Sequence, residues 1–484
     1  MADEIELKLE LTREAADAVE ASGLLAGDPE TAQQRSIYFD TSDRILLNAG
    51  FSLRIRRSGR KRVQTIKAGG ASAAGLFARS EWERPVKDDT PILDDTTPIR
   101  ALLGDAADAI APAFEVRIER RTWTISESDT TIELALDRGE AVAGYRRSPI
   151  CEIELELKQG DPAALFALAG RIDAAAPVRL SVQTKAERGY RLTGPVARLV
   201  KAEPVILAGD MTAAQAFRHI VQSCMRQFRL NEALLLVGRD SGALHQARVA
   251  LRRLRSAFSI FRPMIGDAGT YLGEGLRWLA SELGEARNLD VLLERARPGA
   301  LHDRIAAARE AAYDRVGDVL SSPRARGLML DLAEWTLGGE WLAPSDSHAE
   351  GNQPARAFAI TALDRFRRKV KKGGRDLARA DDKARHKVRK DAKKLRYAAE
   401  FFAGLFERKR EKRRYKRFVK ALEALQDQLG ALNDLATAAE VLEKLGVAGD
   451  PDAPRLLAGG QKKKLLEVAG DAHEDLFDTK PFWR

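Results

Sequence analysis

Charged side chains, most of them carboxylates, occupy every second position in two stretches of this 484-residue chain, EIELKLE at residues 4–10 and CEIELELK at residues 151–158. Side chains two apart on an extended strand point to the same side, about 6–7 Å from one another. Like charges this close repel, and a cation between them relieves the repulsion. The spacing therefore predicts a bound cation. The two acidic rows are Glu4 with Glu6, and Glu152 with Glu154 and Glu156.

Other segments carry cations in the same alternation. Arg54 and Arg56 share one face of LRIR at residues 53–56, and Lys67 ends the run TIK. One interpretation is a set of half-buried strands with solvated polar faces. Solvated faces usually mix charges of both signs, however, whereas these rows are sorted by sign. If the rows face inward, a cavity with carboxylates on one wall and guanidinium groups on another would suit phosphoryl transfer.

The bound cation is expected to be a hard divalent metal. All candidate ligands offer oxygen, and the sequence contains no CxxC pair or Cys/His cluster. Such ligands select Mg²⁺ or Mn²⁺, which combine a few carboxylates with substrate phosphates.

Arg117 and Arg120 stand at an odd and an even position, so a regular strand turns only one of the two side chains inward. Further charged positions on strand-like segments are Glu81, Glu83, Asp137, Arg117 and Arg120.

Eight short alternating segments in the first 195 residues predict an eight-stranded antiparallel β-barrel enclosing a tunnel. Helical periodicity at 12–23, 98–109 and 161–175 predicts flanking helices. The expected strands are 5–11, 35–41, 51–57, 62–68, 78–86, 115–125, 130–139 and 150–158.

From about residue 210 onward the periodicity is helical, so the predicted fold class is α+β. The segment ALHQARVALRRLRSAFSIF at 243–261 aligns without gaps with ARHKVRKDAKKLRYAAEFF at 384–402. This repetition predicts an all-α, duplicated helical bundle. The expected domains are 1–200 and 201–484, and the second would hold two copies at about 205–340 and 355–484.

Charge divides the chain in the same way. The net charge is +9 overall, −4 over residues 1–200 and +13 over residues 201–484, and residues 361–420 hold 25 Lys and Arg against 8 Asp and Glu. The second half is therefore expected to attract a polyanion. No apolar run reaches membrane-spanning length, the acidic start is unlike a signal peptide, and two cysteines cannot form a disulfide framework. We expect a cytoplasmic protein without membrane contact.

Both helical copies repeat one basic face, because spacings of three and four residues place side chains on the same side of a helix. A single basic face is usually solvated. Clustered like charges destabilise a helix, however, and their presence in both copies favours anion binding. Aromatic stacking residues are sparse, which argues against nucleic acid. The faces are His245, Arg248, Arg252 and Arg255, and His386, Arg389, Lys393 and Arg396.

The N-terminal motifs resemble the CYTH domain of the triphosphate tunnel metalloenzymes. The resemblance implies an eight-stranded barrel whose tunnel binds a triphosphate and a divalent metal. Activities in that family include inorganic, thiamine and RNA triphosphatases and adenylate cyclases. The matching motifs are EIELK (4–8), YFDT (38–41), LRIR (53–56), TIK (65–67), RSEWE (79–83), ALD (135–137), CEIELELK (151–158) and TKAERGY (184–190).

Carried over to this sequence, the resemblance implies a role for each matching residue. Lys185 lies where the family has a lysine near the attacking water, whereas Glu81 and Glu83 would organise basic residues or a metal. The implied metal ligands are Glu4, Glu6, Asp137, Glu152 and Glu154. The implied phosphate-binding residues are Lys8, Arg54, Arg56, Lys67, Arg79, Arg120 and Lys185. The implied catalytic residues are Glu6, Arg56 and Lys185.

The helical repeat, HxxRxxxxxLR followed by LGEARNLD or LGALND, resembles the CHAD domain. This resemblance implies that inorganic polyphosphate binds in a basic groove between the copies, and that the protein is found at polyphosphate granules. The two basic faces named above would then contact phosphates. His245 and His386 could instead be capping or packing residues. The run RKREKRRYKR at 408–417 either widens the groove or is a solvated surface.

Together with these patterns, the two resemblances imply a metal-dependent inorganic triphosphatase that converts triphosphate to diphosphate and phosphate, with a helical module that tethers polyphosphate. A non-catalytic polyphosphate-binding or targeting protein is the alternative from another class. A thiamine or nucleoside triphosphatase, or a cyclase, would need a base-binding pocket, and the sequence offers no recognisable one. Substrate chain length, the choice between Mg²⁺ and Mn²⁺, and oligomeric state are left open.

Overall fold

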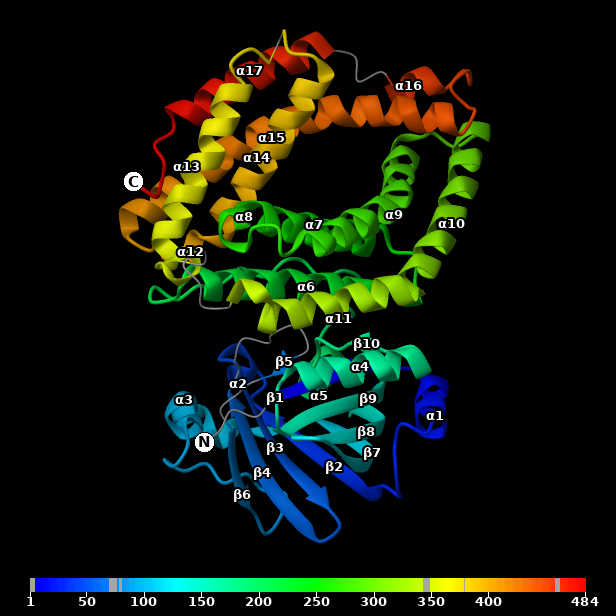
Figure 1. Cartoon of the computed structure of the whole chain (residues 1–484), viewed down its shortest axis with the longest axis vertical. Helices are drawn as coiled ribbons and strands as arrows, with labels where there is room; N and C mark the ends of the chain where they lie inside the picture. Colours follow the sequence, from blue (N-terminus) through cyan, green and yellow to red (C-terminus); the bar gives the residue numbers. More distant parts are fainter. Residues whose placement is uncertain (1–4, 69–75, 78–80, 343–348, 378, 458–461) are drawn as a thin grey trace. The chain divides into compact units, whose positions relative to one another are not determined.

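The computed structural model describes residues 5–68, 76–77, 81–342, 349–377, 379–457 and 462–484 (Figure 1). The chain divides into two compact units. No helix in the described ranges combines the length and the apolar character needed to span a bilayer. The first unit comprises Met1–Arg198 and Arg326–Gly338, and the second comprises Leu199–Ala325 and Gly339–Arg484.

The first unit is built on one antiparallel sheet with strand order β10-β1-β9-β8-β7-β2-β3-β4-β6, and β5 also pairs with β1. Neighbouring strands are therefore often far apart in the sequence. The strands are β1 (Ile5–Glu10), β2 (Glu30–Asp40), β3 (Phe51–Ser58), β4 (Lys61–Ala68), β5 (Leu76–Phe77), β6 (Glu81–Pro85), β7 (Ala111–Glu127), β8 (Thr130–Ala143), β9 (Arg146–Gln159) and β10 (Arg179–Leu180).

The predicted fold class is confirmed, because an antiparallel sheet with flanking helices precedes an all-helical region. Each of the eight predicted strands corresponds to a strand of the sheet, and the two-residue strands β5 and β10 are additional. The structure differs from the predicted barrel in one respect. Over the described residues no ladder joins β6 to β1, so the sheet is not closed by hydrogen bonds.

The apolar face of the sheet is its helix-covered face. Leu7, Leu9 and Leu155 are completely buried. Helix α4 (Ala163–Ala175) packs against β1 and β9, and α1 (Arg13–Ala21) packs against α4. Because side chains alternate along a strand, the charged residues of β1 and β9 must then point to the opposite, inner face of the curved sheet.

The other helices of this unit are α2 (Ile45–Asn48), α3 (Pro98–Leu103), which continues as a 3₁₀ segment, and α5 (Lys185–Leu192). Helix α5 was not predicted. The Thr184 hydroxyl accepts from Glu187 N, and the Glu187 carboxylate accepts from Thr184 N, so a capping box starts the helix. Carbonyls at its end accept hydrogen bonds from arginines that lie far away in the sequence. These caps hold the short helix against β7, β8 and β9.

The second unit repeats one order of helix packing. In the first copy α6 packs on α7, α7 on α9 and α9 on α10; in the second copy α13 packs on α14, α14 on α15 and α15 on α17. Helices α7 and α14 join the copies. The helices are α6 (Ala213–Val237), α7 (Ser241–Ile260), α8 (Arg262–Ile265), α9 (Thr270–Arg295), α10 (Ala300–Ser321), α12 (Ala349–Asn352), α13 (Ala355–Gly373), α14 (Asp382–Phe401), α15 (Lys409–Lys444), α16 (Ala453–Leu457) and α17 (Lys462–Asp478).

Helix α11 (Pro323–Gly338) lies in the predicted helical half, yet from Arg326 onward it is grouped with the first unit. Arg326 Nε lies 2.6 Å from Asp173 Oδ1, and the guanidinium is almost fully buried. No sequence pattern indicates this grouping, because an ion pair between residues 153 apart has no local periodicity. The predicted domain limits themselves stay a prediction.

Candidate active site

A polar cavity of about 390 Å³ lies on the inner face of the sheet. Strands from both ends of the sheet and the start of α5 contribute to its wall. Glu6, Arg56 and Glu154, which come from three different strands, all face it. The sorted rows of charge therefore look inward at one another. The predicted site residues that line the cavity are Glu6, Lys8, Arg54, Arg56, Lys67, Arg120, Glu154 and Lys185.

One wall of the cavity is acidic, because strand register brings carboxylates to the same level. Glu6 on β1 is the ladder partner of Glu156 on β9, and Glu156 is in turn the partner of Glu133 on β8. All three line the cavity. Lys158 Nζ lies 2.5 Å from Glu156 Oε1 and partly offsets this charge. Glu133 was missed from the sequence, although it shares the parity of Asp137 on the same strand.

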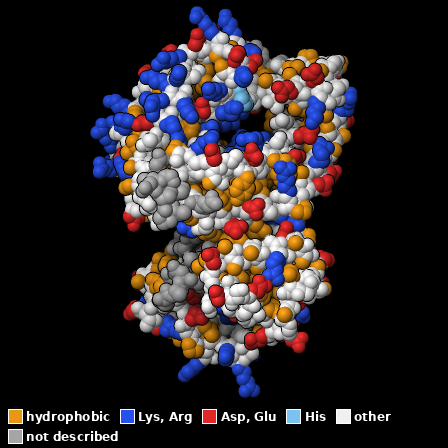
Figure 2. Space-filling model, in the orientation of Figure 1, with side chains coloured by type: hydrophobic (Ala, Val, Ile, Leu, Met, Phe, Trp, Pro, Cys, Tyr) orange, Lys and Arg blue, Asp and Glu red, His pale blue; other side chains and the backbone are white. Residues whose placement is uncertain are grey.

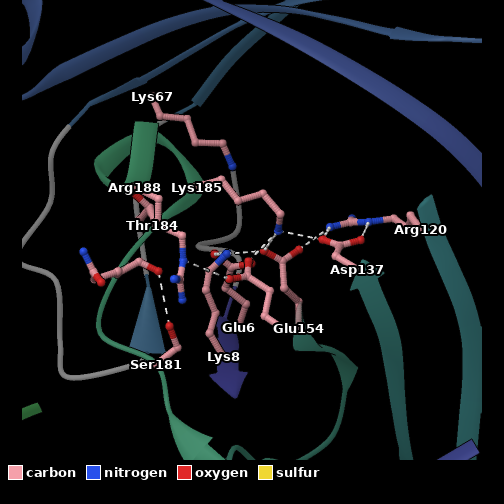
Figure 3. Close-up of polar contacts among 12 residues, drawn as sticks. Glu6, Lys8, Lys67, Arg120, Asp137, Glu154, Ser181, Thr184, Lys185 and Arg188 are labelled. Carbon is pink, nitrogen blue, oxygen red and sulfur yellow. Dashed lines mark hydrogen bonds and ion pairs between the residues drawn. The ribbon is translucent and has the colours of Figure 1, made fainter. Parts of the chain in front are cut away.

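Deeper in the same wall, Lys185 occupies the centre of a second carboxylate group (Figure 3). Its Nζ lies 2.6 Å from Asp137 Oδ2, 2.6 Å from Glu152 Oε1 and 3.0 Å from Glu154 Oε1. Burial disfavours the ammonium, but the charges of Asp137, Glu152 and Glu154 outweigh burial and raise the pKa of Lys185. Lys185 is therefore a permanent cation near neutral pH and cannot act as a base.

Arg120 and Lys8 complete the neutralisation of this group. Arg120 binds Asp137 with two parallel hydrogen bonds, Nε to Oδ1 at 2.7 Å and Nη2 to Oδ2 at 2.6 Å, and it also donates to Glu154. Lys8 donates to Glu154 and lies 3.2 Å from Glu6. Burial would raise the pKa of Glu154, but Lys185, Lys8 and Arg120 together hold it well below its ordinary value. Glu154 is therefore ionised in the folded protein.

The facing wall, on β3, is basic, and Glu81 and Glu83 on β6 line the same cavity. Arg54 and Arg56 both line the cavity, and the buried Nε atom of each has no hydrogen-bond partner among the residues described. The charge of Arg54, then burial, and then Arg120 lower the pKa of Arg56 to about 10. Tyr38 OH accepts a long hydrogen bond of 3.5 Å from Arg54. Two adjacent guanidinium groups with free donors fit the oxygens of a phosphate chain.

The remaining predicted residues line the cavity, lie on the surface or fall outside the described residues. Lys67 Nζ lies 2.8 Å from Glu81, and Thr65 donates to Glu83 at 2.9 Å, so both acids contact donors at the cavity edge. Arg117 is exposed and lies 2.8 Å from Glu115, whereas Arg120 faces inward. Glu4 and Arg79 lie outside the described residues.

The predicted metal ligands fall into two groups. Glu6 and Glu154 line the cavity, whereas Asp137 and Glu152 are completely buried behind it. Oxygens of Asp137, Glu152 and Glu154 lie within 4.8 Å of one another, but Lys185 already contacts all three side chains. The oxygen-only set that faces the cavity fits a hard divalent cation. It comprises Glu6, Glu81, Glu83, Glu133, Glu154 and Glu156.

Helix α5 adds Arg188, which the sequence interpretation did not include. Its Nη2 lies 2.9 Å from Glu10 and its Nε lies 3.8 Å from Glu152. Arg188 follows Lys185 by one helical turn, so α5 presents two cations to the same acidic strand. Arg44 and Arg146 donate to carbonyls at the end of the helix, at 2.7 Å to Thr193 O and 2.6 Å to Leu192 O. The position of Lys185 thus depends on contacts at both ends of α5.

In the second unit, the basic faces of α7 and α14 approach one another. Burial, then Arg252, Arg389 and Arg396, lower the pKa of Lys393 to about 7. Arg252 belongs to the first copy and Lys393 to the second, so the two faces act on each other directly. The space-filling view shows an opening in this unit with many Lys and Arg side chains around it (Figure 2).

The basic face of the first copy includes a cation that was not predicted, Arg287. Burial, then Arg287, Arg252 and Arg248, lower the pKa of His245 to about 4, so this imidazole is neutral near pH 7. Arg248 donates to Ala280 O at 2.8 Å. Arg287 lies in the LGEARNLD segment and was missed, because only the packing of α9 on α7 brings it to this face.

The basic face of the second copy has hydrogen-bond partners and one acidic neighbour. His386 Nδ1 and Arg389 Nη1 each lie 3.2 Å from Asn433 Oδ1. Arg396 lies 3.5 Å from Glu400. In the first copy Arg255 lies near another cation, since burial and Arg277 lower its pKa. The two copies thus share their basic positions but differ in their surroundings.

Family profiles match both halves of the chain. The CYTH domain profile matches residues 2–190, and the CHAD domain profile matches residues 219–443. A Haemophilus influenzae protein named inorganic triphosphatase is 30% identical over 203 residues, which cover 40% of this chain and 55% of that protein. The match therefore spans about half the length of this curated relative.

Solved structures are similar to each part. The CHAD domain of the plant Ricinus communis is 28% identical, with a TM-score of 0.49, and the match covers 58% of this chain and 97% of that one. A Hippeastrum protein studied as an adenylyl cyclase, and described as having a dominant triphosphatase activity, is 21% identical with a TM-score of 0.31, and the match covers 39% of this chain and 95% of that one.

The two profile matches confirm both resemblances seen in the motifs. The chain is a CYTH–CHAD protein, with a CYTH domain at residues 2–190 followed by a CHAD domain at residues 219–443.

Proposed function

We propose that the first unit is a metal-dependent triphosphatase that hydrolyses inorganic triphosphate to diphosphate and phosphate. The observation that carries this proposal is the pair Arg54 and Arg56, whose buried Nε atoms have no partner among the described residues and which share one cavity with Glu6 and Glu154. A linear polyanion would satisfy the guanidinium groups, and a divalent cation would join it to the carboxylates. The similarity to a protein named inorganic triphosphatase supports the same activity.

The chemistry is an in-line displacement at the terminal phosphoryl group. Water attacks phosphorus, the bond to the bridging oxygen breaks, and diphosphate leaves. Arg54, Arg56 and Lys67 would hold the phosphate oxygens and stabilise the charge that develops on them. A Mg²⁺ or Mn²⁺ ion held by Glu6 and Glu154, with Glu133 and Glu156 beside them, would supply Lewis-acid stabilisation at the phosphoryl oxygens.

Lys185 would act as a fixed cation in this reaction. Its ammonium is surrounded by Asp137, Glu152 and Glu154, and its raised pKa keeps it protonated. It can donate a hydrogen bond to water or phosphate, and it holds the carboxylates of the acidic wall in place. The proton released by the attacking water would pass to a phosphate oxygen or to solvent.

The cavity favours an inorganic chain over a nucleotide or a thiamine ester. Among the described lining residues, Tyr38 is the one aromatic side chain. Its ring is already stacked on Phe114, with centroids 4.6 Å apart, and Tyr38 is almost fully buried. A base or thiazole ring would therefore find no free aromatic face. The volume of about 390 Å³ lies at the small end of the range for ligand pockets.

We further propose that the basic faces of α7 and α14 bind inorganic polyphosphate. The cations of these faces repel one another, as the lowered pKa values of Lys393 and His245 indicate, and a polyanion would relieve that repulsion. A tethered chain would raise the local substrate concentration. Polyphosphate granules in the cytoplasm are the location that this proposal implies.

A phosphate-release assay on the full-length chain tests the proposed activity. Triphosphate, long-chain polyphosphate, ATP and thiamine triphosphate are compared, each with Mg²⁺ and with Mn²⁺. We expect triphosphate to be hydrolysed fastest and chelation to stop the reaction. Absence of phosphate release from every substrate, with triphosphate still bound, would instead favour a non-catalytic binding protein.

A further inference from the structure

The first three turns of α15 carry a row of cations on one side. Spacings of three and four residues place these side chains along one helix face, over about 16 Å at the helical rise per residue. Every member is exposed to solvent. We call this row the α15 stripe; it consists of Lys409, Lys412, Arg413, Lys416, Arg417 and Lys420.

The stripe has almost no acidic neighbours. Among the described residues, a single ion pair involves it, between Lys412 and Glu407 at 3.8 Å. Glu411 is the one acid within this segment, but its carboxylate accepts from Arg408 N at 3.0 Å and lies 2.7 Å from Arg356 Nη2. Glu411 therefore neutralises groups on the other side of the helix.

This arrangement opposes the stability of the helix itself. Positive charges near a helix N-terminus are unfavourable, because the free N–H groups already give that end positive character. Like charges three and four residues apart add repulsion. The stripe ends abruptly, since the next exposed charges on this side are Glu423 and Asp427. Its charge is therefore concentrated in one place, as a binding surface for a polyanion would be.

Several observations select the kind of polyanion. The stripe contains no apolar side chain that could enter a bilayer. Tyr415, the aromatic residue of this segment, packs edge-on against Phe482 with ring centroids 5.2 Å apart, so it is not free to stack on a base. The stripe also approaches the basic face of α14, because Arg396 Nη1 lies 4.0 Å from Glu423, one turn beyond Lys420.

We propose that the α15 stripe is a second binding surface for inorganic polyphosphate, which long chains reach after filling the α7 and α14 faces. This inference rests on the proposed polyphosphate binding of the second unit. Short chains would occupy the α7 and α14 faces alone, whereas long chains would contact both surfaces. Affinity would therefore rise with chain length until both surfaces are covered.

Binding of short-chain and long-chain polyphosphate to the full-length protein tests the stripe. The stripe variant combines Lys412→Glu, Arg413→Glu, Lys416→Glu and Arg417→Glu. We expect its affinity for long chains to fall at least about tenfold. The slope of log affinity against log salt concentration should become less steep by roughly 0.7 for each lost phosphate contact, the value for single strands. Its affinity for short chains is expected to stay at the parent value.

A matched control reverses four exposed cations on α13, Arg368, Lys369, Lys371 and Lys372, which changes the net charge by the same amount. Equal losses in the two variants would show a general charge effect and overturn the inference, as would a stripe variant that binds long chains like the parent. A stripe variant that loses only duplex DNA binding would make the stripe a nucleic-acid surface instead. If the parent itself binds neither chain length, the proposed polyphosphate function fails as well.

Discussion

Lys185 Nζ lies 2.6 Å from Glu152 Oε1 in the interior of the first unit, and the two side chains are 9% and 0% exposed. An ion pair this deeply buried is costly to break, because removing one partner leaves the other charge without solvent or counter-ion. Lys185 also contacts Asp137, so one ammonium lies between two carboxylates that water does not reach, and Arg120 and Arg188 add positive charge beside them. The acidic wall of the cavity is therefore assembled around a lysine.

Replacement of Lys185 by Met is expected to destabilise the first unit by about 3–5 kcal/mol, the usual loss for an orphaned buried charge. Urea unfolding of the full-length chain would measure this. Lys158→Met is the control, since Lys158 is 41% exposed and its pair with Glu156 should contribute less than about 1 kcal/mol. Similar unfolding curves for the two variants would contradict the structural role of Lys185.

Replacement of Arg56 by Ala is expected to reduce triphosphate turnover at least about 100-fold, the scale for losing one electrostatic stabiliser. Stability should be unchanged or slightly higher, because Arg54 and Arg120 repel the Arg56 guanidinium and lower its pKa. Steady-state kinetics and thermal unfolding measured on the same samples separate these effects. Arg117→Ala, at an exposed arginine on β7, should leave turnover unaltered. Near-normal turnover in the Arg56 variant would remove the main support for the phosphate wall.

Removal of divalent metal with a chelator is expected to abolish turnover, and added Mg²⁺ or Mn²⁺ to restore it. Calorimetric titration of the metal into the protein gives a readout that does not depend on activity. Glu6→Gln and Glu156→Gln should each weaken binding by about tenfold or more, because each removes a charged oxygen ligand. Glu127→Gln, at an exposed carboxylate on β7, serves as the control. Equal metal affinity in all three variants would place the metal elsewhere.

Polyphosphate binding is expected to weaken as the pH rises through about 7. Burial, then Arg252, Arg389 and Arg396, lower the pKa of Lys393 to about 7, with Asp434 acting in the opposite direction. A bound polyanion favours the ammonium form, so the complex takes up a proton that the free protein lacks above this pH.

The affinity should therefore fall by up to about tenfold per pH unit above 7 and level off below it. His245 does not contribute to this change, because its pKa of about 4 keeps it neutral over the range. Titrations at several pH values, with proton uptake measured in buffers of different ionisation enthalpy, would follow the effect. In Lys393→Arg the dependence should disappear. An unchanged affinity between pH 6 and 8.5 in the parent would disprove the assignment.

Much of the first unit could be predicted because periodicity is local. The alternation of EIELKLE places Glu6 and Lys8 on one face and Leu7 on the other in any extended strand. The same argument assigned Arg54 and Arg56 to one wall. Helical spacing likewise put His245, Arg248 and Arg252 on one side of α7, whatever the rest of the chain does.

Only the tertiary structure decided which strands and helices meet. Glu133 joins Glu156 through the register of β8 and β9, and Lys185 reaches Asp137 because α5 packs over three strands. Neither relationship has a sequence period, since pairing depends on backbone hydrogen bonds and packing between distant segments. The sequence by itself determined which side chains share a face. The burial of the apolar side under α1 and α4 decided which faces enclose a cavity and which cations neutralise its carboxylates.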